Sequence, residues 1–136
     1  MAIGTQIKLD GEREFKKALA DINAGLRVTA SELMLVTAKY SDNATSVQAL
    51  TDKNDVLERR IYSQTEKIAK LREALEASAR EYGESDTKTM KWQVSLNKAE
   101  AELVKMEKEL QDNSKELNKA KENMEKYGLA TDEVAE

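Results

Sequence analysis

Two long runs of apolar residues, with steps that alternate between three and four residues, limit what this chain can fold into. One run extends from Val47 to Tyr82 and the other from Trp92 to Tyr127. Sustained three-four spacing keeps a narrow apolar stripe facing a partner helix, so it predicts a coiled-coil seam. Gly83 and the polar residues that follow it separate the two runs. The pattern therefore predicts a long antiparallel helical hairpin.

The register of this hairpin is predicted from the polar residues inside the two runs. A turn centred near Gly83 places Asn54 opposite Asn113, where the two side-chain amides can hydrogen-bond to each other. A shifted register would leave each amide against leucine, at a cost of order 1–3 kcal/mol. The predicted coiled-coil core consists of Leu50, Asn54, Leu57, Ile61, Ile68, Leu71, Leu75, Trp92, Leu96, Leu103, Met106, Leu110, Asn113 and Leu117.

The residues before the hairpin predict a short extended segment and a first helix. Apolar and polar residues alternate loosely within residues 1–10, which is typical of a strand. Asp10 can cap a helix over residues 11–41, and the turn-favouring residues Ser41-Asp42-Asn43 end it. Gly25 lowers helix propensity by roughly 1 kcal/mol, so the pattern leaves open whether this helix is continuous.

The chain is therefore predicted to be all-α, with three long helices and an extended N-terminal segment. The last two helices form the antiparallel coiled-coil hairpin over residues 44–127, with its turn at residues 83–85. Residues 128–136 look like the opening of a further helix, and we expect them to begin the continuation of a longer chain. The first helix either packs along the hairpin or associates with another copy.

An apolar stripe at the N-terminal end is the candidate surface for contact between copies. No second strand is predicted that could pair with the extended segment. Packing against the hairpin would use only part of the apolar stripe of the first helix. Trp92 could serve as an interaction anchor, but we expect it to close the end of the hairpin core. The candidate residues for self-association are Ile3, Ile7, Leu9, Phe15, Leu19, Ile22 and Leu26.

Composition argues against catalysis and against several classes of partner. The chain has no cysteine and no histidine, which removes the commonest general base and the commonest metal ligands. Its carboxylates are interleaved with lysine and arginine, and no phosphate-binding or calcium loop is present. We therefore predict no enzyme activity, no cofactor and no metal site. Each predicted helix carries balanced charge, so we expect neither nucleic-acid nor membrane binding.

Four stretches of the chain carry a resemblance to a known family. The order of these stretches and the Lys-Leu-Asp-Gly-Glu start are more specific than any single one of them. Together they resemble the N-terminal region of tail tape measure proteins from phages and prophages of Gram-positive bacteria, over most of residues 6–120. The stretches are Ile7–Leu19 (IKLDGEREFKKAL), Val47–Leu57 (VQALTDKNDVL), Tyr82–Lys88 (YGESDTK) and Trp92–Leu103 (WQVSLNKAEAEL).

The resemblance implies a structural role in the tail of a long-tailed phage. Members of the family are long, mostly helical chains, several per tail, around which tail-tube subunits polymerise, and their length sets the length of the tail. The implied partners are other copies of the chain, tail-tube proteins and tail-assembly chaperones. The implied location is the virion tail, assembled in the bacterial cytoplasm. A chain of 136 residues is too short to set a tail length, so we expect it to be the leading segment of a longer protein.

Two other kinds of protein fit part of this pattern. A cytosolic coiled-coil adaptor would recruit its partners through helix-in-groove contacts, and its coding sequence would stop after Glu136. A membrane-surface amphipathic protein would need a basic face, which the balanced charge does not provide. The open reading frame beyond Glu136 separates the tape measure hypothesis from the adaptor, and liposome co-sedimentation tests the membrane alternative.

Overall fold

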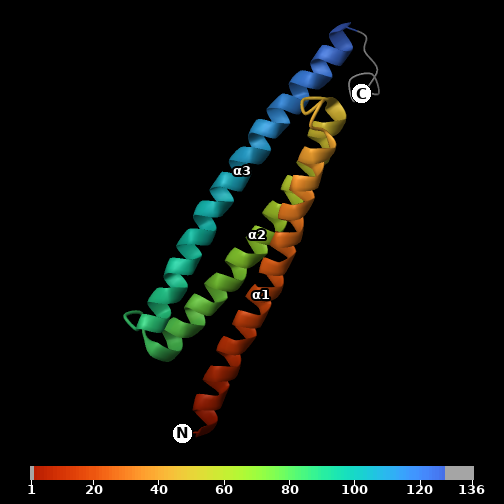
Figure 1. Ribbon diagram of the computed structural model, residues 1–136. Helices are drawn as coiled ribbons and strands as arrows, with labels where there is room; N and C mark the ends of the chain where they lie inside the picture. The colour runs from red at the N-terminus through yellow and green to blue at the C-terminus, as the bar shows by residue number, and fades with distance from the viewer. Residues whose placement is uncertain (1, 128–136) are drawn as a thin grey trace. The chain divides into compact units, whose positions relative to one another are not determined.

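The computed structural model describes the backbone of residues 2–127 and the side chains of residues 11–127. Over this range the protein is all-α, with three long helices and no strand (Figure 1). Helix α1 covers Ala2–Lys39, α2 covers Val47–Tyr82 and α3 covers Thr87–Tyr127. The predicted all-α class with three helices is confirmed. The predicted continuation over residues 128–136 lies outside the described residues.

The prediction of an extended segment over residues 1–10 was wrong, because α1 begins at Ala2. A lone strand leaves its backbone N–H and C=O groups without partners, whereas a helix pairs them locally. No strand exists in residues 2–127 to complete a ladder, so the helical state satisfies this backbone better. The alternation of apolar residues there does not correspond to a strand. Helix α1 is also continuous through Gly25, which answers the question that the sequence left open.

Two compact units divide the described chain, and each contains parts of all three helices. The first unit contains residues 2–26 and 63–103, and the second contains residues 27–62 and 104–127. In the first unit, a buried cluster joins one leucine of α1 to side chains of α2 and α3: Leu19, Ile68, Leu71, Leu96 and Ala99. In the second unit, a cluster joins α2 to α3: Val47, Leu50 and Leu117, with Ala120 and Met124 packed against it.

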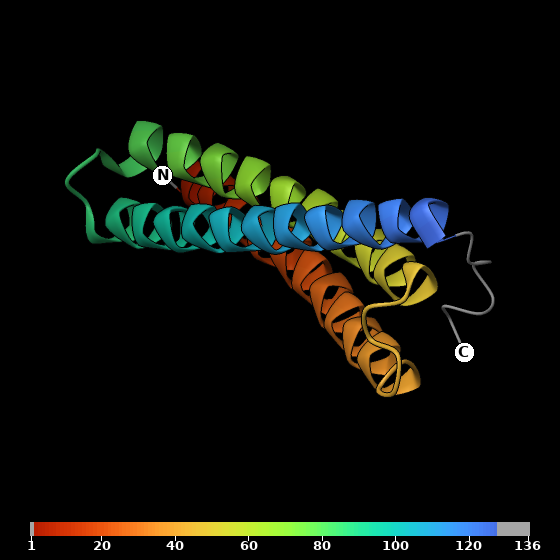
Figure 2. The same ribbon diagram turned by 90° about the horizontal axis from the view of Figure 1, so that it is seen from above.

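The connection between α2 and α3 has a defined backbone geometry. Figures 1 and 2 both show the end of α2 beside the start of α3 within the first unit. The N–H of Gly83 donates to the carbonyl oxygen of Ala79 at 2.9 Å, and the φ angle of Gly83 is +93°. This left-handed conformation ends the helix, as the glycine in the sequence predicted. Asp86 then caps α3, since its Oδ1 accepts the backbone N–H of Lys88 at 2.8 Å.

Alanine at two glycine positions is expected to act in opposite directions. Gly83→Ala forces an L side chain into positive φ and should lower the free energy of unfolding by about 1–2 kcal/mol. Gly25→Ala lies within α1, where an added Cβ meets no atom within 4 Å, and should raise it by about 1 kcal/mol. Urea unfolding followed by circular dichroism measures both. Equal effects at the two positions would contradict the assigned backbone geometry.

Side-chain hydrogen bonds hold the connection between α1 and α2 within the second unit. The Tyr40 hydroxyl donates to Oδ2 of Asp52 at 2.7 Å, and this bond raises the pKa of Tyr40. Ser46 caps α2, because its Oγ accepts the backbone N–H of Ala49 at 3.1 Å. The predicted break at Ser41-Asp42-Asn43 lies inside this connection, but the sequence analysis did not identify Ser46 as the cap. Because of this cap, α2 begins at Val47 and not at the predicted residue 44.

Candidate functional site

The predicted coiled-coil core divides into buried and half-buried side chains. In the first unit, Ile68, Leu71 and Leu96 share one buried cluster, and in the second unit Leu50 and Leu117 share another. The buried members are Leu50, Leu57, Ile68, Leu71, Leu96, Met106, Asn113 and Leu117. The half-buried members are Asn54, Ile61, Leu75, Trp92, Leu103 and Leu110.

Asn113 connects α3 to α2 in the second unit. Its Nδ2 donates to the carbonyl oxygen of Leu50 at 2.9 Å and to Oδ1 of Asn54 at 3.2 Å. The Ser114 hydroxyl donates to the same Asn54 oxygen at 3.1 Å. The amide of Asn113 is buried, so these bonds replace the ones it would make to water. The two asparagines meet as the register argument predicted.

Gln64 is the corresponding polar residue of the first unit. Its side chain is fully buried, and its Nε2 donates to the carbonyl oxygen of Ala99 at 2.9 Å. Its Oε1 is also buried and has no hydrogen-bond partner among the described residues. Gln64 occupies a position of the three-four spacing between Val47 and Tyr82, but spacing could not reveal that it would bond a backbone carbonyl.

The stripe predicted for self-association is used inside the first unit. Leu19 is buried in the cluster with Leu71 and Leu96. Phe15 packs its ring against Trp92, with centroids 6.5 Å apart and an angle of 69° between the planes. Ile22 and Leu26 are half-buried. The side chains of Ile3, Ile7 and Leu9 lie outside the described side chains.

Four exposed apolar residues of α3 lie on a different face from the seam. Met90, Val94 and Val104 are more than half exposed, and Ala101 is exposed as well. They follow a second three-four spacing along α3, in which Asn97 occupies the remaining position. We call these five residues the outer stripe of α3. It was not predicted from the sequence, although its spacing is that of a second seam on the same helix.

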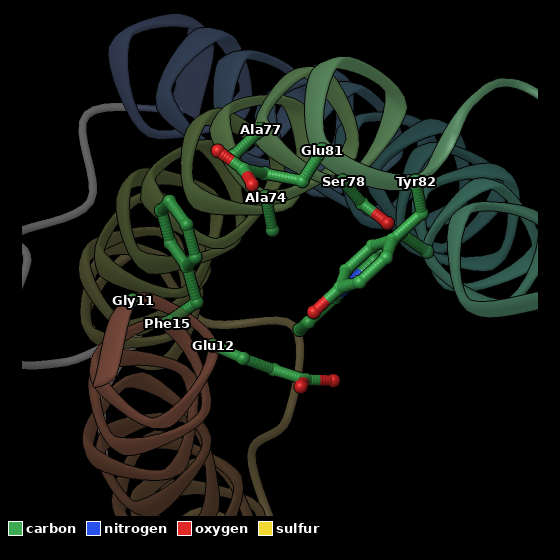
Figure 3. A pocket seen from close by; sticks show the side chains of 9 residues that line it. Gly11, Glu12, Phe15, Ala74, Ala77, Ser78, Glu81 and Tyr82 are labelled. Atoms are coloured by element: carbon green, nitrogen blue, oxygen red, sulfur yellow. The ribbon is translucent and has the colours of Figure 1, made fainter. Parts of the chain in front are cut away.

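A small pocket lies in the first unit between residues of all three helices. Its volume is about 190 Å³. Figure 3 shows Phe15 and Tyr82 on opposite sides of the open space, with Glu12 and Glu81 along its edges. The lining residues are Gly11, Glu12, Phe15, Ala74, Ala77, Ser78, Glu81, Tyr82 and Trp92. The pocket could not be predicted from the sequence, because its lining comes from three separate helices.

The shortest ion pair among the described side chains lies in the second unit and joins α1 to α2. Nη2 of Arg59 lies 2.7 Å from Oε2 of Glu32 and 3.2 Å from Oδ2 of Asp55. The hydrogen bond from Arg59 lowers the pKa of the Glu32 carboxyl below its ordinary value of 4.5 and raises the pKa of Arg59. The pair thus stabilises the charged form of both groups.

The lowered pKa of Glu32 predicts how stability depends on pH. The folded protein binds this proton less tightly than the unfolded chain, so the stabilisation is complete above the ordinary pKa of 4.5 and is lost as pH falls through the folded value. Glu32→Gln should therefore lower the unfolding midpoint at neutral pH and have less effect in acid. Asp42→Asn, which removes a carboxylate from an exposed position, serves as the matched control. A Glu32→Gln effect that is independent of pH would contradict this assignment.

Two kinds of site are absent from the described part of the chain. No group of three or more acidic, histidine or cysteine side chains is placed to hold a metal ion there. Within the same residues, no helix has the length and apolar character needed to cross a membrane. Comparison with protein-family models, with curated proteins and with solved structures finds no significant match.

Proposed function

We propose that this chain is the N-terminal segment of a phage tail tape measure protein and acts as a structural protein through helix-helix contacts. The main support is the four-part sequence resemblance. The architecture is compatible with it, because three helices of 36 to 41 residues provide long lateral surfaces. A helix also advances by about 1.5 Å per residue, which lets residue count encode length.

We also propose that α2 and α3 form one antiparallel coiled-coil hairpin along their lengths. The contacts that support it lie in both units. Ser78 bonds Thr89 at 2.9 Å near the turn, and Gln64 bonds the Ala99 carbonyl farther along. The bond between Asn113 and Asn54 continues the same order in the second unit. From one contact to the next the α2 residue number falls, from 78 to 64 to 54, while the α3 residue number rises, from 89 to 99 to 113, as an antiparallel register requires.

Contact between copies is the third part of the proposal, and we assign it to the outer stripe of α3. Residues that flank an apolar stripe decide how two helices pair. One flank is basic and the other is polar or acidic: Lys91, Lys98 and Lys105 against Gln93, Glu100 and Glu107. When the α3 helices of two copies pair in parallel, the basic flank of one faces the polar or acidic flank of the other. In an antiparallel pair, lysines face lysines. Glu100 also lies 3.7 Å from Arg72, an exposed pair that costs little to rearrange.

Sedimentation equilibrium tests this contact. Val94→Glu places a charge in the outer stripe and should shift the protein toward monomer by about tenfold in the dissociation constant, since burying an unpaired charge is costly. Val28→Glu makes the same change at an exposed position of α1 and should leave association unchanged. A wild-type protein that stays monomeric at high concentration would exclude the contact.

The tail role is tested in the bacterium that encodes the chain. After induction of the prophage, particles are purified and their proteins identified by mass spectrometry. We expect peptides of this chain in the particles, together with a tube protein and with peptides encoded downstream of Glu136. A stop codon after Glu136, unrelated neighbouring genes and absence from the particles would instead favour the coiled-coil adaptor. The exposed outer stripe of α3 would then serve as the adaptor's partner surface.

A further inference from the structure

We propose that two copies of this chain pair in parallel and in register through their outer stripes, with Asn97 of one copy hydrogen-bonded to Asn97 of the other. This inference rests on the copy-to-copy contact proposed above. It adds the alignment of the two helices and the residue that selects this alignment. A second copy fits the surface because the two flanks of the stripe carry opposite charges, which makes the surface complementary to itself.

The outer stripe and the seam lie on opposite sides of α3. An α-helix turns by about 100° per residue, which places Val94 and Ala101 on the side of α3 opposite Leu96 and Ala99. Leu96 and Ala99 are buried in the cluster of the first unit, whereas Val94 is 52% exposed. A second copy can therefore cover the outer stripe without displacing the contacts that α3 makes within the unit.

The charged flanks favour the parallel orientation. In the heptad notation abcdefg, Val94 is an a residue, so Glu100 is the g residue of that heptad and Lys105 is the e residue of the next. Charge pairs between g and e residues of two helices set their orientation, and in a parallel pair Glu100 faces Lys105 of the other copy. The 3.7 Å pair between Glu100 and Arg72 is about half-exposed on both sides, so water screens it and it exchanges readily for this contact.

Asn97 is the residue that selects the register. Its Oδ1 accepts a hydrogen bond from Nε2 of Gln93 at 2.9 Å. An amide oxygen has two lone pairs, so the same Oδ1 can also accept Nδ2 of Asn97 of the other copy. A shift of one heptad would place Asn97 against Met90 or Val104 and bury its amide without a partner. A single polar residue in a coiled-coil seam fixes register in this way.

The stripe is short, which limits the strength of the contact. It ends at Val104, because the next two positions of the same spacing are Lys108 and Gln111. The favourable charge pattern ends there as well, since Glu107 would face Asp112 of the other copy. Small interfaces form weak pairs. We therefore expect pairing at high protein concentration, and we expect it to weaken as salt screens the flanking charges.

Disulfide cross-linking tests the register, because the chain contains no cysteine of its own. Ala101→Cys places one thiol in the stripe, and in a parallel, in-register pair the two thiols face each other. With diamide as the oxidant, we expect disulfide-linked dimers to form about tenfold faster than in Ser95→Cys. Ser95 is the matched control because it is exposed on α3 outside the stripe. Equal rates in the two variants would overturn the proposed register.

A spin label tests the orientation separately. Lys115 is exposed on α3 beyond the stripe, and Lys115→Cys carries the label there. In a parallel pair the two labels lie close together, whereas in an antiparallel pair centred near Asn97 they are separated by about 50 Å. We expect a distance well below this value. A distance of about 50 Å would retain the contact between copies and overturn the parallel alignment, whereas a monomer in sedimentation equilibrium would exclude the contact itself.

Charge reversal tests the pairing of Glu100 with Lys105. Glu100→Lys and Lys105→Glu should each weaken association about tenfold, because each places like charges face to face. The two substitutions together in one chain should restore it. Glu116→Lys with Lys121→Glu is the matched control, since it makes the same exchange at the same spacing on exposed positions beyond the stripe. Association that stays weak in the double variant, with helicity unchanged by circular dichroism, would overturn the proposed charge pairing.

Asn97→Val tests the role of the amide. An apolar side chain at this position should tighten association about tenfold and make the alignment less selective. A mixture of Ala101→Cys and Val94→Cys chains reports the alignment, since a shift of one heptad brings these two positions together. We expect mixed disulfides when both chains also carry Asn97→Val, and few when Asn97 is present. Equal amounts in the two cases would overturn the assignment of the register to Asn97.

Discussion

Replacing Leu71 by alanine is expected to lower the free energy of unfolding by about 2–5 kcal/mol. Leu71 is 2% exposed and belongs to the cluster that joins α1, α2 and α3 in the first unit. The variant loses the transfer energy of the removed carbon atoms and leaves a cavity that the long helices cannot easily close. Urea unfolding followed by circular dichroism gives the difference from the wild type.

Leu35→Ala is the matched control for this effect. It makes the same chemical change in α1, but Leu35 is 68% exposed. We therefore expect a difference of about 0.5 kcal/mol or less. If both variants lost similar stability, the leucine cluster of the first unit could not be the source of the effect at Leu71.

Replacing Asn113 by alanine should lower the free energy of unfolding by about 1–3 kcal/mol. The substitution removes the donor to Leu50 and Asn54 and leaves a partly buried amide oxygen with one partner fewer. Asn118→Ala, at an exposed position of the same helix, should change stability by about 0.5 kcal/mol or less. A double-mutant cycle between Asn54 and Asn113 measures their coupling energy. A coupling energy near zero would exclude the hydrogen bond between them as the cause of the stability loss in Asn113→Ala.

Asn113→Leu separates stability from register. Leucine fills the seam without a polar group, so we expect stability near that of the wild type but weaker selection of one alignment of α2 on α3. Spin labels at the exposed positions Glu58 and Glu109 report this alignment within the second unit. A single narrow distance distribution in the wild type should broaden in the variant. An unchanged distribution would show that other residues set the register.

Much of the architecture could be predicted because it depends on local signals. Gly83 ends α2 where the sequence placed the turn, and the meeting of Asn54 and Asn113 followed from counting residues on either side of it. Both inferences use helix geometry alone. They required no knowledge of how α1 packs.

The features that were missed depend on competition between patterns or on three-helix packing. Residues 2–10 show a strand-like alternation, yet without a partner strand the helix is the better way to satisfy their backbone. The buried face of Phe15 and Leu19 was assigned to contact between copies because no spacing rule says which surface α1 selects. Predicting the pocket beside Trp92 also requires knowing which surface α1 packs against, so the sequence could not reveal it.

The connection at Gly83 also offers a place to attach reporters. Its backbone polar groups are largely satisfied locally, since Gly83 bonds Ala79 and accepts the N–H of Asp86. Glu84 and Ser85 are exposed, so neither contributes to a core. Exposed loop tips of this kind tolerate inserted sequence. An epitope or a fluorescent peptide grafted between these two residues would therefore label the chain without altering the buried faces of α2 and α3.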